Sequence, residues 1–153
     1  MVLAGVYDED IELLETILVD GSYTLGNFAE NLANDNTKFV YADRELNKII
    51  EDVSKEDDIP IRKENIACTE CFDLYVNDMD VIIDKFPKDK NIVGNEMESF
   101  ALFYTAKTLN KRAACLLTVV DSLRKKQSLT AEERQKSLND MIKIALDSAI
   151  KLT

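Results

Sequence analysis

The feature that most constrains the fold of this chain is a short, nearly continuous apolar run close to residue 115. The run reads Ala-Ala-Cys-Leu-Leu-Thr-Val-Val and occupies residues 113–120. It is far shorter than the roughly 18 residues that a transmembrane helix requires. Short runs of this kind are typical of strands that are buried on both faces of a sheet. We therefore predict a buried strand over residues 112–120.

Segments with helical spacing lie on both sides of this strand. Before it, Asn95 is placed to cap a helix that ends near Asn110, with Glu98 in the capping-box position. After it, Thr130 and Glu133 form a second capping box, which predicts one long C-terminal helix. Helix, buried strand, loop and helix in succession predict a parallel sheet with helices packed on its faces.

The chain upstream of residue 95 has a similar mixed pattern. Residues 11–18 suit a helix or a strand equally well, because their apolar residues fit both periods. The remaining predicted elements are a strand end and turn at residues 1–6, an amphipathic helix at 43–53, a polar loop at 51–58, a strand at 61–66 that leads into residues 67 and 68, a short helix at 78–86 and a loop at 121–129.

Charge and cysteine content narrow the function classes. With no internal repeat, residues 1–153 are treated as a single domain. The formal net charge of −10 repels nucleic-acid phosphates and anionic lipid heads, so we expect neither nucleic acid nor a membrane as a partner. The three cysteines form no disulfide framework, and the N-terminus shows no basic leader before an apolar run. We therefore expect a cytoplasmic protein with reduced cysteines.

Three motifs in the second half of the chain point to a known family. They read Gly-Asn-Glu-Met-Glu-Ser at residues 94–99, Thr-Val-Val-Asp-Ser at 118–122 and Thr-Ala-Glu-Glu-Arg-Gln at 130–135, the last running into Asn-Asp-Met-Ile-Lys-Ile-Ala-Leu at 139–146. In order and spacing they resemble the hexameric, DeoD-type purine nucleoside phosphorylases. Residues 65–72 and 4–6 resemble the same family more loosely.

The resemblance implies an α/β fold of three layers, αβα, as in the nucleoside phosphorylases. It also implies that roughly the first third of the usual chain is absent, so that the central sheet would be incomplete. An incomplete sheet would leave an exposed strand edge on which another chain could pair.

The resemblance implies a general acid and its partner. Cleavage of a purine N-glycosidic bond requires a proton on N7 of the departing base, and Asp121 matches the acid that supplies it. Arg134 matches the arginine that approaches this acid. A neighbouring arginine favours the ionised carboxylate, which cannot donate a proton. The resemblance therefore implies that the arginine closes on the acid transiently during catalysis.

The resemblance also implies a nucleoside-binding set. Glu98 matches the glutamate that accepts hydrogen bonds from the ribose 2′ and 3′ hydroxyls, and Met97 matches a methionine packed on the sugar. Phe72 matches the aromatic that stacks on the base, and Glu96 belongs to the same Glu-Met-Glu segment as Glu98. We take these four residues as candidate nucleoside contacts.

The chain departs from the family pattern at three positions. Val120 replaces the usual serine before the acid, and Asn95 stands where a valine is expected. Leu3 stands where the family has a phosphate-contacting serine. The glycine-rich phosphate loop, the clamping arginines and the histidine donated across the subunit interface belong to the absent part. No phosphate-binding residue is identified.

The function implied is phosphorolysis of purine ribonucleosides to free base and ribose 1-phosphate, by a homo-oligomer. Phosphate would be a co-substrate, and no metal or organic cofactor is expected. Two alternatives stay open, namely a phosphate-independent nucleosidase and a non-catalytic remnant that binds nucleoside or another subunit. The activity of the shortened chain alone is left open.

Five of the six candidate residues also have a purely structural interpretation. Glu98 could serve only as a capping residue, and Asp121 and Arg134 could be ordinary surface charges. Met97 and Phe72 could be core residues. Cys68 and Cys71 have the spacing of a redox or zinc motif, but the chain has no histidine and no second cysteine pair, which favours structural cysteines. The basic residues at 124–126 are expected to be solvated.

Overall fold

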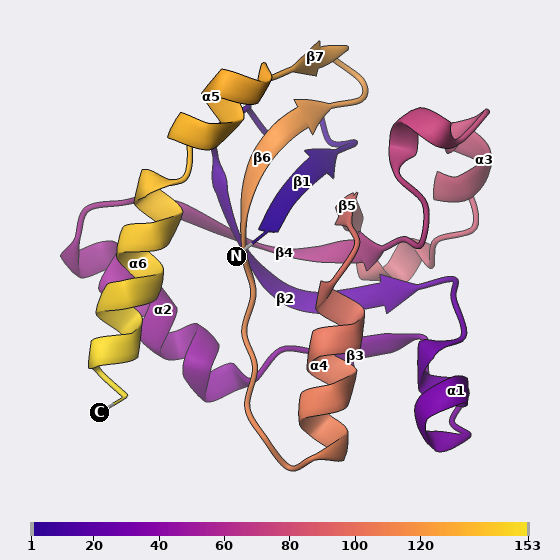
Figure 1. Cartoon of the computed structure of the whole chain (residues 1–153), viewed down its shortest axis with the longest axis horizontal. Coiled ribbons are helices and arrows are strands. Elements are labelled where there is room, and N and C mark those ends of the chain that lie inside the picture. The colour runs from indigo at the N-terminus through magenta and orange to yellow at the C-terminus, as the bar shows by residue number, and fades with distance from the viewer. Residues whose placement is uncertain (1, 153) are drawn as a thin grey trace.

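The computed structural model describes residues 2–152 of the chain (Figure 1). Its strands are β1 (Val2–Val6), β2 (Thr16–Thr24), β3 (Phe39–Tyr41), β4 (Ile61–Cys68), β5 (Ile92–Glu96), β6 (Leu116–Ser122) and β7 (Gln127–Ser128). Its helices are α1 (Phe28–Ala33), α2 (Arg44–Glu56), α3 (Met79–Ile83), α4 (Ser99–Thr108), α5 (Ala131–Lys136) and α6 (Asn139–Ile150), with short 3₁₀ turns η1 (Asp73–Tyr75) and η2 (Lys88–Lys90).

The strands form one mixed sheet in the order β3-β2-β4-β5-β1-β6-β7. Strand β2 also pairs with β6, so that β2, β4, β5, β1 and β6 close into a ring. The predicted α/β fold with a central sheet is confirmed, but the sheet is not purely parallel. The β1–β5 and β2–β6 pairs are antiparallel. Among these five strands the exposed edge predicted for an incomplete sheet is absent, because ring closure pairs each strand on both sides.

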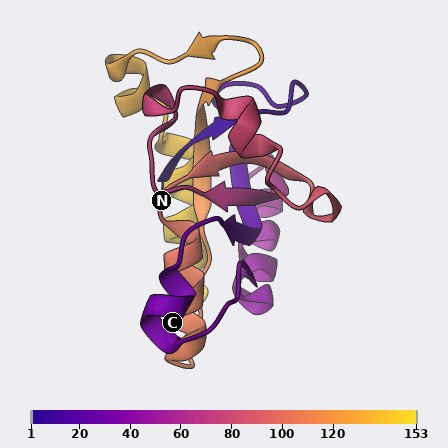
Figure 2. The same ribbon diagram turned by 90° about the vertical axis from the view of Figure 1, so that its right-hand side faces the viewer.

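Helices cover two sides of the ring. Helices α2 and α6 contact each other on one side, where Leu18 and Leu116 of the sheet meet Val53 and Ile144 in an apolar cluster. Helix α4 packs against β2, β3 and β4 in a second cluster, which includes the fully buried Phe100 and Phe103. Figure 2 shows β7 and α5 at one end of the molecule, and α1 and α4 at the other.

The helix predicted to begin at Asn95 is wrong. Residues 92–96 form strand β5, and the helix begins at Ser99 with Glu98 as its N-cap residue. Asn95 pairs with Gly5 of β1 and Ala67 of β4. The backbone bonds of two neighbouring strands therefore override the local capping signature.

The single long C-terminal helix is also wrong, because the chain forms α5 and α6 with a break at Ser137 and Leu138. The Ser137 hydroxyl donates to the Arg134 carbonyl at 3.0 Å, a local bond that competes with helical continuation. Helix α5 buries no residue, whereas α6 buries Met141 and Ile144. The predicted capping box of Thr130 and Glu133 is present.

Other predicted elements are found with shifted ends. Strand β4 and helix α3 lie where strand and helix are predicted, but α2 continues through the predicted polar loop to Glu56. The buried strand runs over Leu116–Ser122 instead of residues 112–120, and part of the predicted loop after it forms β7. The ambiguous segment before residue 18 leads into strand β2, and residues 2–6 form a full strand. No helix within the described residues 2–152 is long and apolar enough to cross a bilayer.

Candidate functional site

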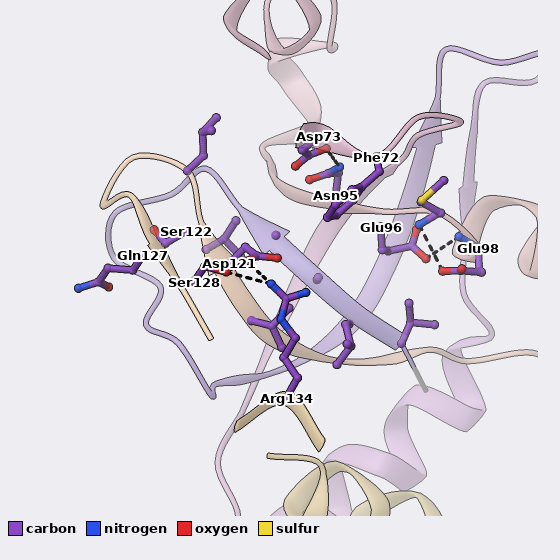
Figure 3. A pocket seen from close by; sticks show the side chains of 18 of the residues that line it. Phe72, Asp73, Asn95, Glu96, Glu98, Asp121, Ser122, Gln127, Ser128 and Arg134 are labelled. Atoms are coloured by element: carbon purple, nitrogen blue, oxygen red, sulfur yellow. Dashed lines mark hydrogen bonds and ion pairs between the residues drawn. The ribbon is translucent and has the colours of Figure 1, made fainter. Parts of the chain in front are cut away.

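A cavity of about 570 Å³ opens beside strand β1, at the ends of β5 and β6. The lining includes all six residues singled out from the sequence: Phe72, Glu96, Met97, Glu98, Asp121 and Arg134. Figure 3 shows them in groups, with Asp121 and Arg134 on one side of the opening and Glu96 and Glu98 on another. Residues far apart in the sequence are thus brought to one concave site, which is the usual setting for small-molecule binding.

Asp121 reaches this cavity through an irregularity in strand β6. In the parallel pair of β1 with β6, Ala4 lies opposite Val119 and Gly5 lies opposite Asp121, so that Val120 is an extra residue. Such bulges re-aim the side chains that follow them. Asp121 therefore faces Gly5, which has no side chain to occupy the space in front of it.

Asp121 and Arg134 form the ion pair expected from the sequence. Arg134 donates from Nη2 to Asp121 Oδ1 at 2.8 Å, and from Nε to the Leu129 carbonyl at 3.0 Å. Ser128 adds a third group, since its hydroxyl donates to Asp121 Oδ1 at 2.5 Å and accepts from Arg134 Nη2 at 2.9 Å. In this structure the arginine is already closed on the acid.

The donors around Asp121 converge on one of its two oxygens. Both Arg134 and Ser128 donate to Oδ1. No hydrogen bond from another described residue reaches Oδ2. A neutral carboxyl group can accept through one oxygen while the other carries and donates a proton. The geometry thus leaves Oδ2 available to a ligand in the cavity.

Glu96, and not Glu98, bonds to the start of helix α4. Glu96 is 3% exposed, and its Oε2 accepts from the backbone N–H groups of Glu98 and Ser99, both at 2.8 Å. Its Oε1 accepts from the Ser99 hydroxyl at 2.5 Å. Burial raises the pKa of Glu96, although these hydrogen bonds oppose the rise.

Glu98 is left with an exposed carboxylate on the cavity wall. Its side chain makes no capping hydrogen bond to α4, and within residues 2–152 it accepts only a 3.3 Å bond from the Met97 backbone N–H. The capping role considered from the sequence is therefore wrong. Its oxygens can accept hydrogen bonds from a ligand at little cost to the helix.

Met97 and Phe72 are not core residues. They are 44% and 38% exposed, and both line the cavity. The Phe72 ring meets Tyr75 edge to face, with centroids 5.8 Å apart. Apolar side chains that stay exposed beside polar groups are the pattern expected of a ligand site.

Sequence reasoning missed the contribution of Asp73 to this site. Asp73 lines the cavity, and its Oδ1 accepts a 2.5 Å hydrogen bond from the Asn95 side-chain N–H. Burial raises the pKa of Asp73, the bond from Asn95 opposes this, and the charge of Asp121 adds to the rise. The only signals were that Asp73 follows Phe72 and that Asn95 departs from the family's valine. Neither shows that the two residues meet.

The cysteine pair and Arg124 of the basic segment, both considered from the sequence, do not line the cavity. Cys68 is buried and Cys71 exposed, and both are free thiols; burial raises the pKa of Cys68 to about 12. No group of three or more metal-ligating side chains is found in residues 2–152. Arg124 pairs with Asp80 at 2.7 Å on the surface. All three positions that depart from the family pattern, Leu3, Asn95 and Val120, line the cavity.

Comparisons with known proteins give a consistent result. Residues 3–151 match the family model of the phosphorylase superfamily. The chain is 30% identical over 148 residues to purine nucleoside phosphorylase DeoD-type 2 of Aliivibrio fischeri, covering 97% of this chain and 61% of that protein. The DeoD-type enzyme of Shewanella denitrificans gives the same identity and coverage. DeoD-type 1 of Vibrio cholerae is 29% identical over 146 residues, 95% of this chain and 59% of that protein. The chain thus spans about three fifths of the length of these relatives.

Proposed function

Because this chain belongs to the phosphorylase superfamily, we propose that it acts on purine ribonucleosides and transfers the ribosyl group to phosphate, releasing the free base and ribose 1-phosphate. The observation that carries this proposal is the joint placement of Asp121, Arg134 and Glu98 around one cavity. The similarity to proteins named purine nucleoside phosphorylase supports the choice of substrate.

Asp121 supplies the proton in this proposal. A proton on Oδ2 passes to N7 of the base while the C1′–N9 bond breaks and its electron pair moves onto the base. Arg134 and Ser128, both bonded to Oδ1, stabilise the carboxylate that the transfer leaves behind.

The sugar is held at the other side of the cavity. Glu98 accepts hydrogen bonds from the ribose hydroxyls, Met97 packs on the sugar and Phe72 stacks on the base. Glu96 positions Glu98 by binding its backbone N–H. We assign these roles from the exposure of the four residues. Glu96 is the only one of the four that is buried, and both of its carboxylate oxygens already accept hydrogen bonds within the protein.

The cavity lining holds few positive charges for phosphate. Lys126 and Arg134 are the cationic side chains that line the cavity within the described residues, and Arg134 is paired with Asp121. Four carboxyl groups share the lining: Asp73, Glu96, Glu98 and Asp121. An anionic nucleophile in such surroundings requires charge neutralisation, so phosphate dependence is the decisive measurement.

The test is cleavage of adenosine and inosine by the purified chain, with and without phosphate, following the released base and the sugar product. We expect release that depends on phosphate and yields ribose 1-phosphate. Release without phosphate, yielding ribose, would replace the proposal with a nucleosidase. Absence of release from both nucleosides would favour a binding-only protein.

Replacement of Glu98 with alanine should weaken nucleoside binding by about 10- to 100-fold, the range for losing hydrogen bonds to a charged group. The melting temperature should change little, because the Glu98 side chain accepts only one long bond. Calorimetric titration of adenosine measures the first quantity. Glu132→Ala is a matched control, since Glu132 is exposed and pairs with Lys136 outside the cavity. Unchanged adenosine affinity in Glu98→Ala would remove Glu98 from the site.

We also propose that the protein acts in the cytoplasm as a homo-oligomer. Three free cysteines fit a reducing compartment. Exposed apolar side chains on α4 and α6, including Leu102 and Leu146, offer surface for contact between subunits. Light scattering of the purified chain would give its mass, and a monomer at working concentration would contradict the second part.

A further inference from the structure

Three polar side chains surround the bare backbone of Gly5 inside the cavity. A Cβ atom placed on Gly5 would lie 3.4 Å from Asn95 Oδ1, 3.4 Å from Asp73 Oδ2 and 3.8 Å from Asp121 Cβ. Asp73 and Asn95 therefore lie beside Asp121, which protonates the purine in the proposed reaction. Figure 3 shows Asp73, Asn95 and Phe72 together at one side of the opening.

The Asp73–Asn95 pair presents acceptors and no free donor. The side-chain nitrogen of Asn95 donates to Asp73 Oδ1 at 2.5 Å and to Thr69 Oγ1 at 3.2 Å, so both of its hydrogens are used. Asn95 Oδ1 is buried and has no hydrogen-bond partner among the residues that the structure describes. Asp73 Oδ2 accepts no hydrogen bond from another described residue. A buried polar group without a partner costs free energy, and a ligand that donates a hydrogen recovers that cost.

The chemistry of the purine edge determines which base fits these acceptors. On the edge that carries N7, adenine presents the N7 acceptor and an amino donor on C6, whereas a 6-oxopurine presents two acceptors. Asp121 donates a proton to N7 in the proposed reaction, and the group on C6 is the next one along the same edge of the base. Asp73 is the neighbour of Asp121 around Gly5, so in this orientation of the base it is the side chain that the C6 group would face.

We propose that Asp73, held in place by Asn95, makes the site selective for purine nucleosides that carry an amino group on C6. This inference rests on the proposed function, because it takes the orientation of the base from Asp121. Asp73 is the specificity-determining residue, and Asn95 is a positioning residue that acts through it. An amino group donates to Asp73 Oδ2, whereas an oxo group meets a second acceptor and is repelled.

The test compares three nucleosides that differ only at C6, namely adenosine, purine riboside and inosine. Their binding to the purified chain is measured by calorimetry, and their cleavage is measured separately with phosphate. Both are measured at pH 8, because burial raises the pKa of Asp73 and a higher pH favours its ionised form. Adenosine should be favoured over inosine by about 10- to 100-fold, the range for a hydrogen bond to a charged group. Purine riboside, with only hydrogen on C6, should lie between them.

Variants assign the selectivity to its residues. Asp73→Asn should reduce the adenosine-to-inosine ratio by about 10-fold or more, because an amide can turn its donor toward an oxo group. Asn95→Val should reduce the ratio by a smaller factor, since Asp73 keeps its charge but loses the bond that holds it. Asp89→Asn, an exposed carboxylate outside the cavity with the same charge change, should leave it unchanged. Both nucleosides are measured on the same preparation of each variant, so a smaller fraction of folded protein affects both values equally and does not change their ratio.

The outcomes separate this inference from the proposed function. Cleavage of adenosine and inosine at equal rates, or an unchanged ratio in Asp73→Asn, would overturn the selectivity and leave the enzymatic proposal standing. Preferential binding of adenosine without any cleavage would support the selectivity and overturn the enzymatic proposal. Failure of all three nucleosides to bind would overturn both.

Discussion

Replacement of Asp121 with asparagine should lower nucleoside turnover by roughly 10²- to 10⁴-fold, the range for losing a general acid. Asparagine keeps the oxygen that accepts from Arg134 and Ser128, so the surrounding geometry is retained. It lacks the acidic proton that would pass to N7. Binding of adenosine should therefore stay nearly unchanged while the rate of cleavage falls.

Single-turnover kinetics and calorimetric titration separate these two effects. Asp84→Asn is a suitable control, because Asp84 is exposed, pairs only with Lys88 and has the same chemical change. A variant that cleaves adenosine as fast as the original chain would exclude Asp121 as the acid. A variant that no longer binds adenosine would show that Asp121 acts in recognition rather than in proton transfer.

Replacement of Gly94 with alanine should destabilise the fold by about 3 kcal/mol, the upper end of the usual range for overpacking. A Cβ on Gly94 would lie 2.2 Å from the Gly5 carbonyl oxygen and 3.0 Å from Val6 Cα, where β5 and β1 pass each other. Both contacts are with backbone, so no side-chain rotation can relieve them. The described glycines have no positive φ, so the cost is steric and not conformational.

Urea denaturation of the variant measures this cost, with Gly26→Ala as the matched control. A Cβ on Gly26 would meet the carboxylate end of Glu70 at 2.2 Å, and that flexible side chain can swing away. The control should lose well under half as much stability as Gly94→Ala. Equal losses at the two positions would mean that the backbone contact at Gly94 is relieved as readily as the side-chain contact at Gly26. Because Asn95 and Glu96 follow Gly94 directly, the variant should also lose nucleoside binding.

The sequence predicted the elements whose signals are local. The capping box of Thr130 with Glu133 needs only four neighbouring residues, and it is present in the structure. The amphipathic pattern of α2 likewise depends on one face of one helix. The same local logic failed at Asn95, because two distant strands supply stronger partners to its backbone.

The sequence selected residues that the structure groups around one cavity, but it did not predict their geometry. Motif resemblance selected Asp121, Arg134 and Glu98, and the structure brings them to one cavity. It could not show that Asn95 donates to Asp73, since the two residues lie 22 positions apart and meet only after β4 and β5 pair. Nor could the motifs show that Glu96 binds the start of helix α4 while Glu98 faces the cavity. That difference depends on which of the two side chains becomes buried.

Closure of the strand ring determines the order in which this chain can complete its fold. Strand β1 is the first described strand, yet its partners are β5 and β6, which begin at Ile92 and Leu116. The pairing of strand β2 with β6 likewise requires distant residues, since Thr16 pairs with Thr118. Contacts between residues so distant in sequence slow folding, because the intervening chain must be ordered first. During synthesis, the first strand therefore emerges from the ribosome long before either of its neighbours, and the ring can close only after residue 122 has been added.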